Sequence, residues 1–433
     1  MLTVKGSLLR HLQWWQTNVK NNYIVNVIAE GYRLPLLDVP LPNIILNNKS
    51  ARDNADFVDT EVEKLEKAGV IVRSGNKPTV INALSVATNA EGKHRLVLDL
   101  RSVNPLLNVT KYKYEDLKVV SDYFKQNCLM AIFDLKSGYH HVDIHEAYTQ
   151  YMGFTWKNID YYYSTCPFGL ATAGIIFSKI LRELVKLWRT KGIAVVLYLD
   201  DGIIVGQSKP EMDRAINIIR TDLLNSGFIV NEEKSNWNPA FQVKWLGFEL
   251  DSKNNIFAVP SEKINRLKRS ILNNLRHRKT SSARDIAKTV GKICSLYHAY
   301  GKLVYLVTKD ASRWIADRNS WAHRAELPES VVSELKFWYK NIDSILNMPL
   351  AVEETEPAFI IYSDASSTGC GAFTQGDTQN HMVHHWTEAE RNTSSTWREL
   401  KTVELYLRLN VEKFQNSKIK WYTDNQGVPH ILR

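Results

Sequence analysis

The sequence predicts a multidomain α+β protein, and three features of the chain support that prediction. Strand-like runs of β-branched and aromatic residues alternate with helix-like segments between about residues 61 and 251. A basic helical stretch follows, in which residues 262–292 hold ten Lys or Arg against two acids. An acidic linker that ends in proline, residues 351–357, then precedes a second α/β pattern. We therefore expect two units that combine helices and strands, joined by a basic helical region.

The individual elements follow from residue spacing and from the residues that interrupt helices. The opening to Pro42 combines a Trp-rich helix with proline-rich, extended chain. Residues 54–69 are expected to form an amphipathic helix that ends at Gly69, with Val58, Val62 and Leu65 on its apolar face. The other predicted helices are 171–191, 210–226, 261–276 and 394–409. The predicted strands are 94–100, 129–135, 161–168, 194–200, 244–250, 358–366, 369–375, 381–386 and 418–424.

The composition excludes several classes of protein. A hydrophobic content of 44% supports real cores, and a net charge of +9 is compatible with a polyanionic partner. The four cysteines form no CxxC pair, so neither a zinc site nor a disulfide framework is expected. The start lacks the apolar core of a signal peptide, and no apolar run approaches the ~18 residues of a membrane span. We therefore expect a soluble protein of the cytoplasm, the nucleus or both, not secreted and without a membrane partner.

Two predicted strands end in carboxylates. Asp134 ends the run "LMAIFD", and Asp200 and Asp201 follow the run "AVVLYL". Each acid alone is more typical of a helix cap or a turn. If the two strands are neighbours in one sheet, however, their carboxylates meet, and two charges ~4 Å apart repel by ~4 kcal/mol at an effective dielectric of about 20. No Lys or Arg lies within the hairpin to relieve that repulsion, so a divalent cation is expected there.

The paired aspartates predict a turn as well as a metal site. Asp201 and Gly202 lie between two apolar runs, which is a strong hairpin signal. Strand alternation puts Tyr198 and Asp200 on one face, which makes Asp200 the better ligand candidate and Asp201 an auxiliary at the turn. A few hard oxygen ligands on a rigid strand edge suit Mg²⁺, with Mn²⁺ as the alternative, and they suit two-metal phosphoryl transfer.

Several ordered motifs around these acids match a known family. They are "HRLVLDLRSVNPLL", "FDLKSGYHHVDI", "CPFGLATAGIIFSKIL", "YLDD", "GFIVNEEKS" and "WLGFELD". The stretch from about Glu61 to Asp251 thereby resembles the fingers and palm of reverse transcriptases. The resemblance implies a right-hand polymerase of fingers, palm and thumb, with Asp134, Asp200 and Asp201 as catalytic metal ligands. It implies RNA-directed DNA synthesis from an RNA template, a DNA primer and dNTPs, in which the primer 3′-hydroxyl attacks the α-phosphate.

The same resemblance assigns residues that contact substrate. Arg95 matches the basic residue that binds the triphosphate, and Tyr139 matches the ring that blocks a 2′-hydroxyl, the group that distinguishes RNA from DNA. Phe168 stands where some relatives carry glutamine. Trp245 belongs to the hairpin that grips the primer, where it either stacks on bases or is core. The full set is Arg95, Tyr139, Phe168, Lys234, Trp245 and Gly247.

A second set of acids follows the linker. Asp364 ends "IIYSD", Glu399 lies on the predicted helix 394–409, and Asp424 ends "IKWYTD". Their order resembles ribonuclease H, which implies a two-metal nuclease site for an RNA–DNA hybrid. That family has a fourth carboxylate and closing elements further along, so the domain is expected to be incomplete and ribonuclease activity is not expected from this chain by itself. The histidines of "HMVHHW" are expected to be ordinary strand residues.

The chain as a whole resembles DIRS-type (tyrosine-recombinase) retrotransposons, with gypsy-type long-terminal-repeat elements as the nearest alternative. The carrying motifs are "KYKYEDLKVV", "FDLKSGYHHVDI", "SSARDIAKTVGKI", "YSDASSTGCGAF" and "STWRELKTVELYL". The resemblance implies a structural nucleic-acid-binding protein and a tyrosine recombinase, encoded by the same element, as partners.

The predicted domain division has four parts. They are an N-terminal extension (1–50), fingers and palm (51–255), a basic helical thumb or connection (256–350), and a ribonuclease H-like domain truncated at its C-terminal end (351–433). A catalytically inactive nucleic-acid-binding relic, or a domesticated retroelement protein, is the alternative function. RNA-directed RNA synthesis is disfavoured by Tyr139 and by the attached nuclease pattern.

Overall fold

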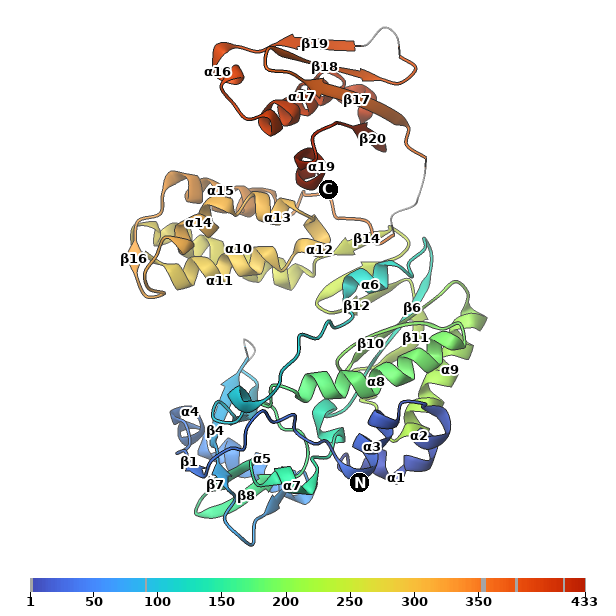
Figure 1. Ribbon diagram of the computed structural model, residues 1–433, viewed down its shortest axis with the longest axis vertical. Coiled ribbons are helices and arrows are strands. Elements are labelled where there is room, and N and C mark those ends of the chain that lie inside the picture. Colours follow the sequence, from blue (N-terminus) through green and yellow to red (C-terminus); the bar gives the residue numbers. More distant parts are fainter. Residues whose placement is uncertain (1–2, 90–91, 352–355, 378–380, 416, 433) are drawn as a thin grey trace. The chain divides into compact units, whose positions relative to one another are not determined.

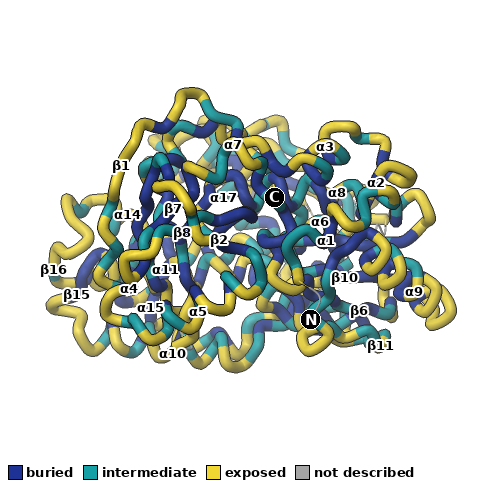
Figure 2. The backbone as a smooth tube through the Cα atoms, turned by 90° about the horizontal axis from the view of Figure 1, so that it is seen from below, coloured by how far each residue is buried: buried dark blue, intermediate teal, exposed yellow. Residues whose placement is uncertain are grey.

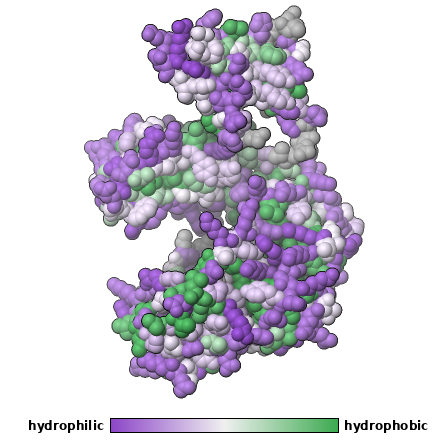
Figure 3. Space-filling view, viewed as in Figure 1, coloured by the Kyte–Doolittle hydropathy of each residue, from purple (hydrophilic) through white to green (hydrophobic). Residues whose placement is uncertain are grey.

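The computed structural model divides into two compact units, Met1–Ala351 and Val352–Arg433 (Figure 1). It describes residues 3–89, 92–351, 356–377, 381–415 and 417–432, so most of the predicted acidic linker, residues 352–355, lies outside the described residues. No helix in these ranges combines the length and the hydropathy of a membrane span. Hydrophilic residues cover much of the face shown in Figure 3, in line with the high content of charged residues.

Unit 1 contains most of the helices and strands. Its α-helices are α1 (Ser7–Arg10), α2 (Leu12–Asn18), α3 (Asn22–Glu30), α4 (Lys49–Asp53), α5 (Ala55–Lys67), α6 (Leu117–Ser121), α7 (Glu146–Thr149), α8 (Ala173–Thr190), α9 (Lys209–Ser226), α10 (Ser261–Arg276), α11 (Ala283–Cys294), α12 (Tyr297–Tyr300), α13 (Leu303–Leu306), α14 (Lys309–Ala316) and α15 (Glu329–Asn341). Short 3₁₀ helices are η1 (Asn104–Leu106), η2 (Gly138–His141) and η3 (Arg278–Thr280).

The strands of unit 1 form several small sheets. They are β1 (Asn43–Ile44), β2 (Ile71–Arg73), β3 (Val80–Ile81), β4 (Ala83–Thr88), β5 (His94–Asp99), β6 (Leu129–Asp134), β7 (Gly153–Trp156), β8 (Ile159–Tyr163), β9 (Ala194–Tyr198), β10 (Asp201–Gly206), β11 (Asn236–Ala240), β12 (Gln242–Trp245), β13 (Phe248–Asp251), β14 (Ile256–Ala258), β15 (Ser281–Ser282) and β16 (Arg324–Ala325). The sheet orders are β1-β3-β7-β8-β2, β11-β6-β10-β9, β12-β13-β14, β4-β5 and β15-β16.

The four-stranded sheet β11-β6-β10-β9 is the centre of unit 1. Its strands alternate between two hydrophobic clusters, because successive side chains point to opposite faces. Ala131 and Phe133 join the cluster that contains the buried residues of α8 and α9, whereas Met130 joins the cluster of β12–β14 and α10–α15. Figure 2 shows the corresponding buried stretches at β6 and β10. A sheet covered on both faces is rigid, and the acids lie at its end.

The N-terminal segment packs into the same core as this sheet. Trp15 on α2 is fully buried, and its indole N–H donates to the carbonyl of Ser226 at the end of α9 over 2.9 Å. The aromatic-rich start is therefore tied to unit 1 by burial and a directional bond, both of which favour a fixed position.

Unit 2 is a four-stranded sheet with one long helix packed against it. Its elements are β17 (Phe359–Ala365), β18 (Gly369–Thr374), β19 (His381–His385), α16 (Glu388–Arg391), α17 (Ser395–Leu409), α18 (Val411–Phe414), β20 (Ile419–Tyr422) and α19 (Gly427–Leu432). The strand order is β19-β18-β17-β20, and β17 and β20 run parallel. Figure 1 shows α17 alongside β17 and β18. Ile361, Met382 and Tyr406 lie in the core between the helix and the sheet.

Two of the predicted elements are wrong in detail. The predicted strand 161–168 corresponds to β8, which ends at Tyr163, because the chain beyond it makes only an isolated bridge at Thr165 before reaching Pro167, which has no backbone N–H. The run 244–250, predicted as one strand, is two strands, β12 and β13, joined by Leu246 and Gly247, in agreement with the hairpin that the resemblance implies. Both of these loop residues have positive φ, 45° and 77°, as a two-residue hairpin of type I′ requires.

Candidate active sites

The turn between β9 and β10 lies one step earlier than the sequence predicts. Tyr198 pairs with Asp201, so the two-residue loop is Leu199–Asp200 and not Asp201–Gly202. Leu199 takes the positive φ of 54° that the turn needs, while Gly202 lies within β10. A Cβ at Gly202 would come within 2.3 Å of the ring of Phe133 on β6. The glycine therefore makes room for a neighbouring ring and is not the turn residue.

This shift changes how the acids are arranged. Asp201 begins β10 and pairs directly with Asp134 at the end of β6, and Asp200 lies on the adjoining turn. Because the turn intervenes, strand alternation does not favour Asp200 over Asp201 as a ligand. The predicted neighbour relationship of the two strands is confirmed.

Asp134 is buried and is held by the segment that follows Phe228. One carboxylate oxygen accepts from Asn231 Nδ2 at 2.8 Å, and the other is 3.3 Å from Lys234 Nζ. The backbone N–H of Asp134 donates to Ser235 Oγ at 3.0 Å. Lys234 thus supplies a positive charge that the hairpin itself lacks, and part of the predicted repulsion is relieved from outside it. Sequence analysis missed Asn231 and Ser235, although both lie within the motif that contains Lys234.

The pKa values of the other two acids, Asp200 and Asp201, are raised. Burial, followed by the charges of Asp200 and Asp134, raises the pKa of Asp201 to about 6. Burial also raises the pKa of Asp200, and the charge of Asp134 adds to the rise. Both shifts have the sign expected where several carboxylates share a partly desolvated place. A bound cation would offset the repulsion between the carboxylates, which is the smaller cause of both shifts.

A cavity of about 380 Å³ opens over these acids. Its lining brings together most of the residues assigned from the sequence: Arg95, Ile132, Phe133, Asp134, Asp200, Asp201, Lys234, Lys244, Trp245 and Leu246. Three acids and three basic side chains line it, and such a mixture suits a ligand that carries both phosphate and metal. Lys244 was not singled out from the sequence.

The rings of Tyr139 and Phe168 pack against each other near the acids, outside the cavity lining. Their ring centroids are 5.2 Å apart, and the guanidinium of Arg95 lies 4.6 Å above the Phe168 ring. Burial raises the pKa of the Tyr139 hydroxyl, with a further contribution from the nearby phenol of Tyr114. Phe168 therefore contacts Arg95 and Tyr139, whether or not it also contacts a ligand.

The β12–β13 hairpin favours the core interpretation of Trp245. Its side chain is 4% exposed and belongs to the hydrophobic cluster of β12–β14, although it also lines the cavity. Gly247 is exposed at the tip, where a Cβ would lie 3.6 Å from Lys263 Nζ. The tip therefore exposes backbone, with the half-buried Lys263 beside it.

Helix α11 carries a cationic stripe that sequence analysis did not resolve into residues. Lys288 and Lys292 are exposed one helical turn apart, and neither has an acid within 4.0 Å among the residues described. The pKa of Lys292 is lowered by burial and by the charges of Lys288 and Arg266. Gly291 lies beside them with nothing within 4 Å of its Cβ position. A mid-helix glycine costs about 1 kcal/mol relative to Ala, and no packing within the protein explains it.

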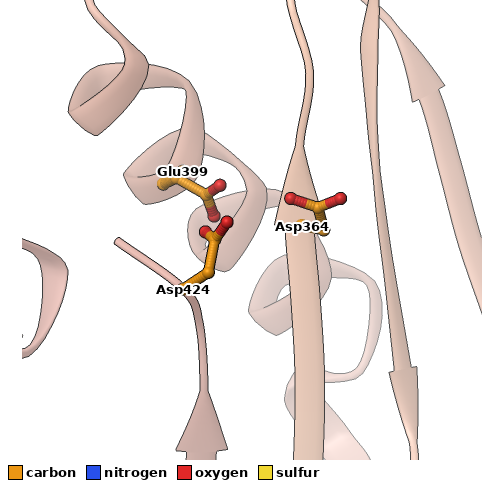
Figure 4. A group of neighbouring side chains, drawn as sticks. All are labelled: Asp364, Glu399 and Asp424. Carbon is orange, nitrogen blue, oxygen red and sulfur yellow. The ribbon is translucent and has the colours of Figure 1, made fainter. Parts of the chain in front are cut away.

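The second set of acids converges in unit 2 (Figure 4). Asp364 on β17, Glu399 on α17 and Asp424 after β20 each offer an oxygen, and these atoms lie within 4.8 Å of one another. Among the described residues, no other group of three or more potential ligands meets that limit. Asp134, Asp200 and Asp201 are therefore neighbours, but they converge less tightly.

Glu399 is the buried anchor of the second set. It is 2% exposed, and its two oxygens accept from the backbone N–H of Ala365 at 3.0 Å and from Thr423 Oγ1 at 3.2 Å. Burial raises its pKa, and the charges of Asp424 and Asp364 add to the rise. Ser394 caps α17 through the N–H of Trp397, which helps to fix where Glu399 lies.

Both donor sets fit Mg²⁺ chemically. Each consists of carboxylate oxygens from rigid elements, the ligands that this hard cation prefers. Asp134, Asp200 and Asp201 would hold ions in unit 1, and Asp364, Glu399 and Asp424 would hold them in unit 2. The His381–His385 strand offers no comparable group among the described residues, and His384 lies 3.7 Å from Glu390 instead.

The central part of unit 1 is similar to a known family, and the chain is similar to several curated relatives. Residues 87–250 match the family model described as reverse transcriptase (RNA-dependent DNA polymerase). The chain is 23% identical over 388 residues to the retrovirus-related Pol polyprotein from transposon gypsy of Drosophila melanogaster, covering 86% of this chain and 36% of that polyprotein. It is 25% identical over 231 residues to the transposon Tf2-3 polyprotein of Schizosaccharomyces pombe, covering 53% and 16%. The chain thus spans little more than a third, or less, of these relatives.

Solved structures resemble the fold across nearly the whole chain. The foamy viral protease-reverse transcriptase in complex with RNA/DNA hybrid superposes with a TM-score of 0.63 at 16% identity, covering 96% of this chain and 57% of that one. The foamy viral protease-reverse transcriptase dRH in complex with double-stranded DNA gives a TM-score of 0.63 at 16% identity, with 98% and 76% covered. These likenesses confirm the predicted multidomain α+β polymerase fold.

Proposed function

We propose that unit 1 is an RNA-directed DNA polymerase, because residues 87–250 match the reverse transcriptase family and the chain is similar to retrotransposon polyproteins. Its substrates would be an RNA template, a DNA primer and dNTPs. The single observation that carries the proposal is the shared cavity in which Asp134, Asp200 and Asp201 face Arg95 and Lys234. The division into fingers and palm (51–255) and thumb or connection (256–350) belongs to the same proposal.

Each of these residues has its own role in nucleotidyl transfer. When bound, divalent ions would activate the primer 3′-hydroxyl and neutralise the phosphate charge. Asp134, Asp200 and Asp201 would hold them, and Arg95, which lines the same cavity, would bind the triphosphate. Tyr139 fills the volume beneath the sugar that a 2′-hydroxyl would need. Lys234, 3.3 Å from Asp134, compensates acid charge and is placed to reach phosphate.

The primer extension assay tests this proposal directly. Purified chain would receive a primed RNA template, Mg²⁺ and either dNTPs or rNTPs. We expect extension with dNTPs and a loss of about 10³-fold or more in Asp200→Asn, because the site loses one of three charges aimed at the reacting phosphates. Asp213→Asn, which changes an exposed acid on α9, is the matched control and should extend normally. Equal extension by Asp200→Asn would reject the proposal, and no wild-type extension would favour an inactive nucleic-acid-binding relic.

We further propose that unit 2 is an incomplete ribonuclease H-like domain whose substrate class, where it cleaves, is the RNA–DNA hybrid. The three convergent oxygens support this assignment. The proposed source is a DIRS-type element with its own structural protein and tyrosine recombinase, and the identity to gypsy keeps a gypsy-type element as the alternative. Hybrid cleavage in Mg²⁺ or Mn²⁺, absent in Asp364→Asn, tests the nuclease assignment.

A further inference from the structure

His141 lies behind the polymerase site and has no role in the mechanism above. It ends η2, the short helix that follows Asp134 and carries Tyr139, and it is 1% exposed. Both ring nitrogens have partners: Nδ1 lies 3.1 Å from the carbonyl of Gly138, and Nε2 lies 3.1 Å from the backbone nitrogen of Ile229.

These partners fix the tautomer of the ring. The Ile229 N–H can only donate, so Nε2 must be the unprotonated acceptor, and Nδ1 then carries the proton and donates to Gly138. An imidazolium would turn Nε2 into a donor and lose the bond to Ile229. Burial accordingly lowers the pKa of His141 to about 4. The ring is therefore neutral, and its two nitrogens bond to two different chain segments.

The connected segments are the one that follows Asp134 and the one that supplies its partners Asn231 and Lys234. The backbone N–H of Asn231 donates to the carbonyl of Asp134, and the backbone N–H of Lys136 donates to the carbonyl of Ile229, each at 2.8 Å. The chain then turns away at Ser137, whose φ is 57°, and the pairing ends there. His141 returns from the far end of η2 to accept the Ile229 N–H. It thereby closes the loop that carries Tyr139.

Aromatic packing extends this connection to the Tyr139 ring. The ring centroid of His141 is 5.0 Å from that of Phe228, and Phe228 is 6.2 Å from Phe177. Phe177 is in turn 5.7 Å from Tyr139. A displaced His141 would therefore disturb the Tyr139 ring through the backbone of η2 and through these packed rings.

We propose that His141 is a positioning residue that fixes Tyr139 relative to Asp134 and Lys234, and so sets the selection of deoxynucleotides over ribonucleotides. The inference rests on the proposed polymerase function. His141 itself touches no substrate, because it is buried behind the loop.

Three substitutions separate the two bonds of the ring. His141→Leu removes both bonds, His141→Gln keeps an acceptor near the position of Nε2, and His141→Asn keeps a donor near that of Nδ1. Ser164→Ala is the matched control, since Ser164 is also buried and its hydroxyl bridges to Gly69 and Val70 outside the site. All chains would be assayed for thermal stability, for kcat and KM with dNTPs, and for the same constants with rNTPs.

We expect His141→Leu to raise the KM for dNTPs about tenfold, with a smaller change in kcat, and to lower the dNTP-to-rNTP selectivity about tenfold. His141→Gln should restore most of the selectivity because it keeps the bond between segments. Ser164→Ala should lose stability without a change in selectivity.

Unchanged selectivity in a folded His141→Leu or His141→Asn protein would overturn the inference while the polymerase proposal stands. So would an equal loss of selectivity in Ser164→Ala, because the effect would then be general loosening of the fold. No extension by the wild-type chain would overturn the polymerase proposal and this inference with it.

Discussion

At the scale of single residues, charge and burial together set the pKa values of the ionisable groups around Asp134. Asp134 has Asn231 and Lys234 as partners, whereas Asp201 faces it across the strands and is left with a raised pKa of about 6. His140 and His141, seven residues or fewer from Asp134, are held neutral instead, each with a pKa lowered to about 4. These opposite shifts give opposite responses to pH.

Replacing Asp201 by Asn should stabilise the metal-free protein at neutral pH. The folded pKa of Asp201 lies above the unfolded value, so ionisation costs stability as pH rises from about 4 to 6, and the cost is complete above that window. After a discount for partial exposure, we expect a gain on the order of 1 kcal/mol at pH 7.5 in EDTA, and no gain at pH 4. Thermal melts of both chains in EDTA measure this, and a lower melting temperature for the variant at pH 7.5 would contradict it.

The two buried histidines should make unit 1 sensitive to acid. Their folded pKa values lie below the unfolded value, so their contribution is fully present above about pH 6.5 and is lost as pH falls toward 4. Each histidine adds a slope of about 1.4 kcal/mol per pH unit in that window. Urea unfolding followed by tryptophan fluorescence at several pH values should give a shallower slope for His141→Gln than for wild type. Identical slopes would show that His141 is not buried and neutral.

At the scale of elements, we propose that α11 contacts nucleic acid. Its exposed Lys288 and Lys292 are one turn apart, and the bare surface at Gly291 lets a partner's backbone come close. The helix is anchored from behind, where Ile286, Val290 and Ile293 are buried. A rigid cationic face of this kind binds phosphate without reading sequence.

Removing the two lysines of α11 should weaken the binding of a primed template and should make that binding less dependent on salt. Each phosphate contact contributes about −0.9 to the slope of log K against log salt for duplex DNA, so Lys288→Ala with Lys292→Ala should reduce the slope by about two. Fluorescence anisotropy between low and moderate salt measures it. Lys186→Ala with Lys209→Ala is the matched control, because both lysines are already paired with acids on their own helices. An unchanged slope in the α11 variant would place the duplex elsewhere.

At the scale of the whole molecule, each unit carries its own acid set on its own sheet. The set in unit 1 lies at the β6–β10 strand pair, and the set in unit 2 comes from β17, α17 and the chain after β20. Each unit also has its own buried core. Loss of charge in one set therefore has no structural reason to affect the other.

Glu399→Gln should abolish any hybrid cleavage while it leaves primer extension within about twofold of wild type. Gln can still accept from Ala365 and can donate to Thr423, so unit 2 keeps its bonds and loses only the charge. Asp200→Asn should show the reverse pattern. Both reactions would be measured on the same preparations. Loss of extension in Glu399→Gln would show that the two sites depend on each other.

The sequence by itself determined the classes of element and the acids that follow the strands. Period-3.6 and strand-like apolar runs predicted α5, α8, α9, α10 and α17 to within a few residues, because these patterns reflect burial on one face or in a sheet. The acids at strand ends, the basic helical stretch and the order of the motifs were likewise visible in the chain.

Only the tertiary structure decided how those acids face one another. The turn at Leu199–Asp200 depends on the Phe133 ring opposite Gly202, and the charge that relieves Asp134 comes from Lys234, a hundred residues along the chain. His141 and Asn231 are likewise defined by partners on distant segments. Local patterns report which face of an element is buried, but pairing across the sheet fixes register and electrostatics, and that pairing is settled by packing between segments far apart in sequence.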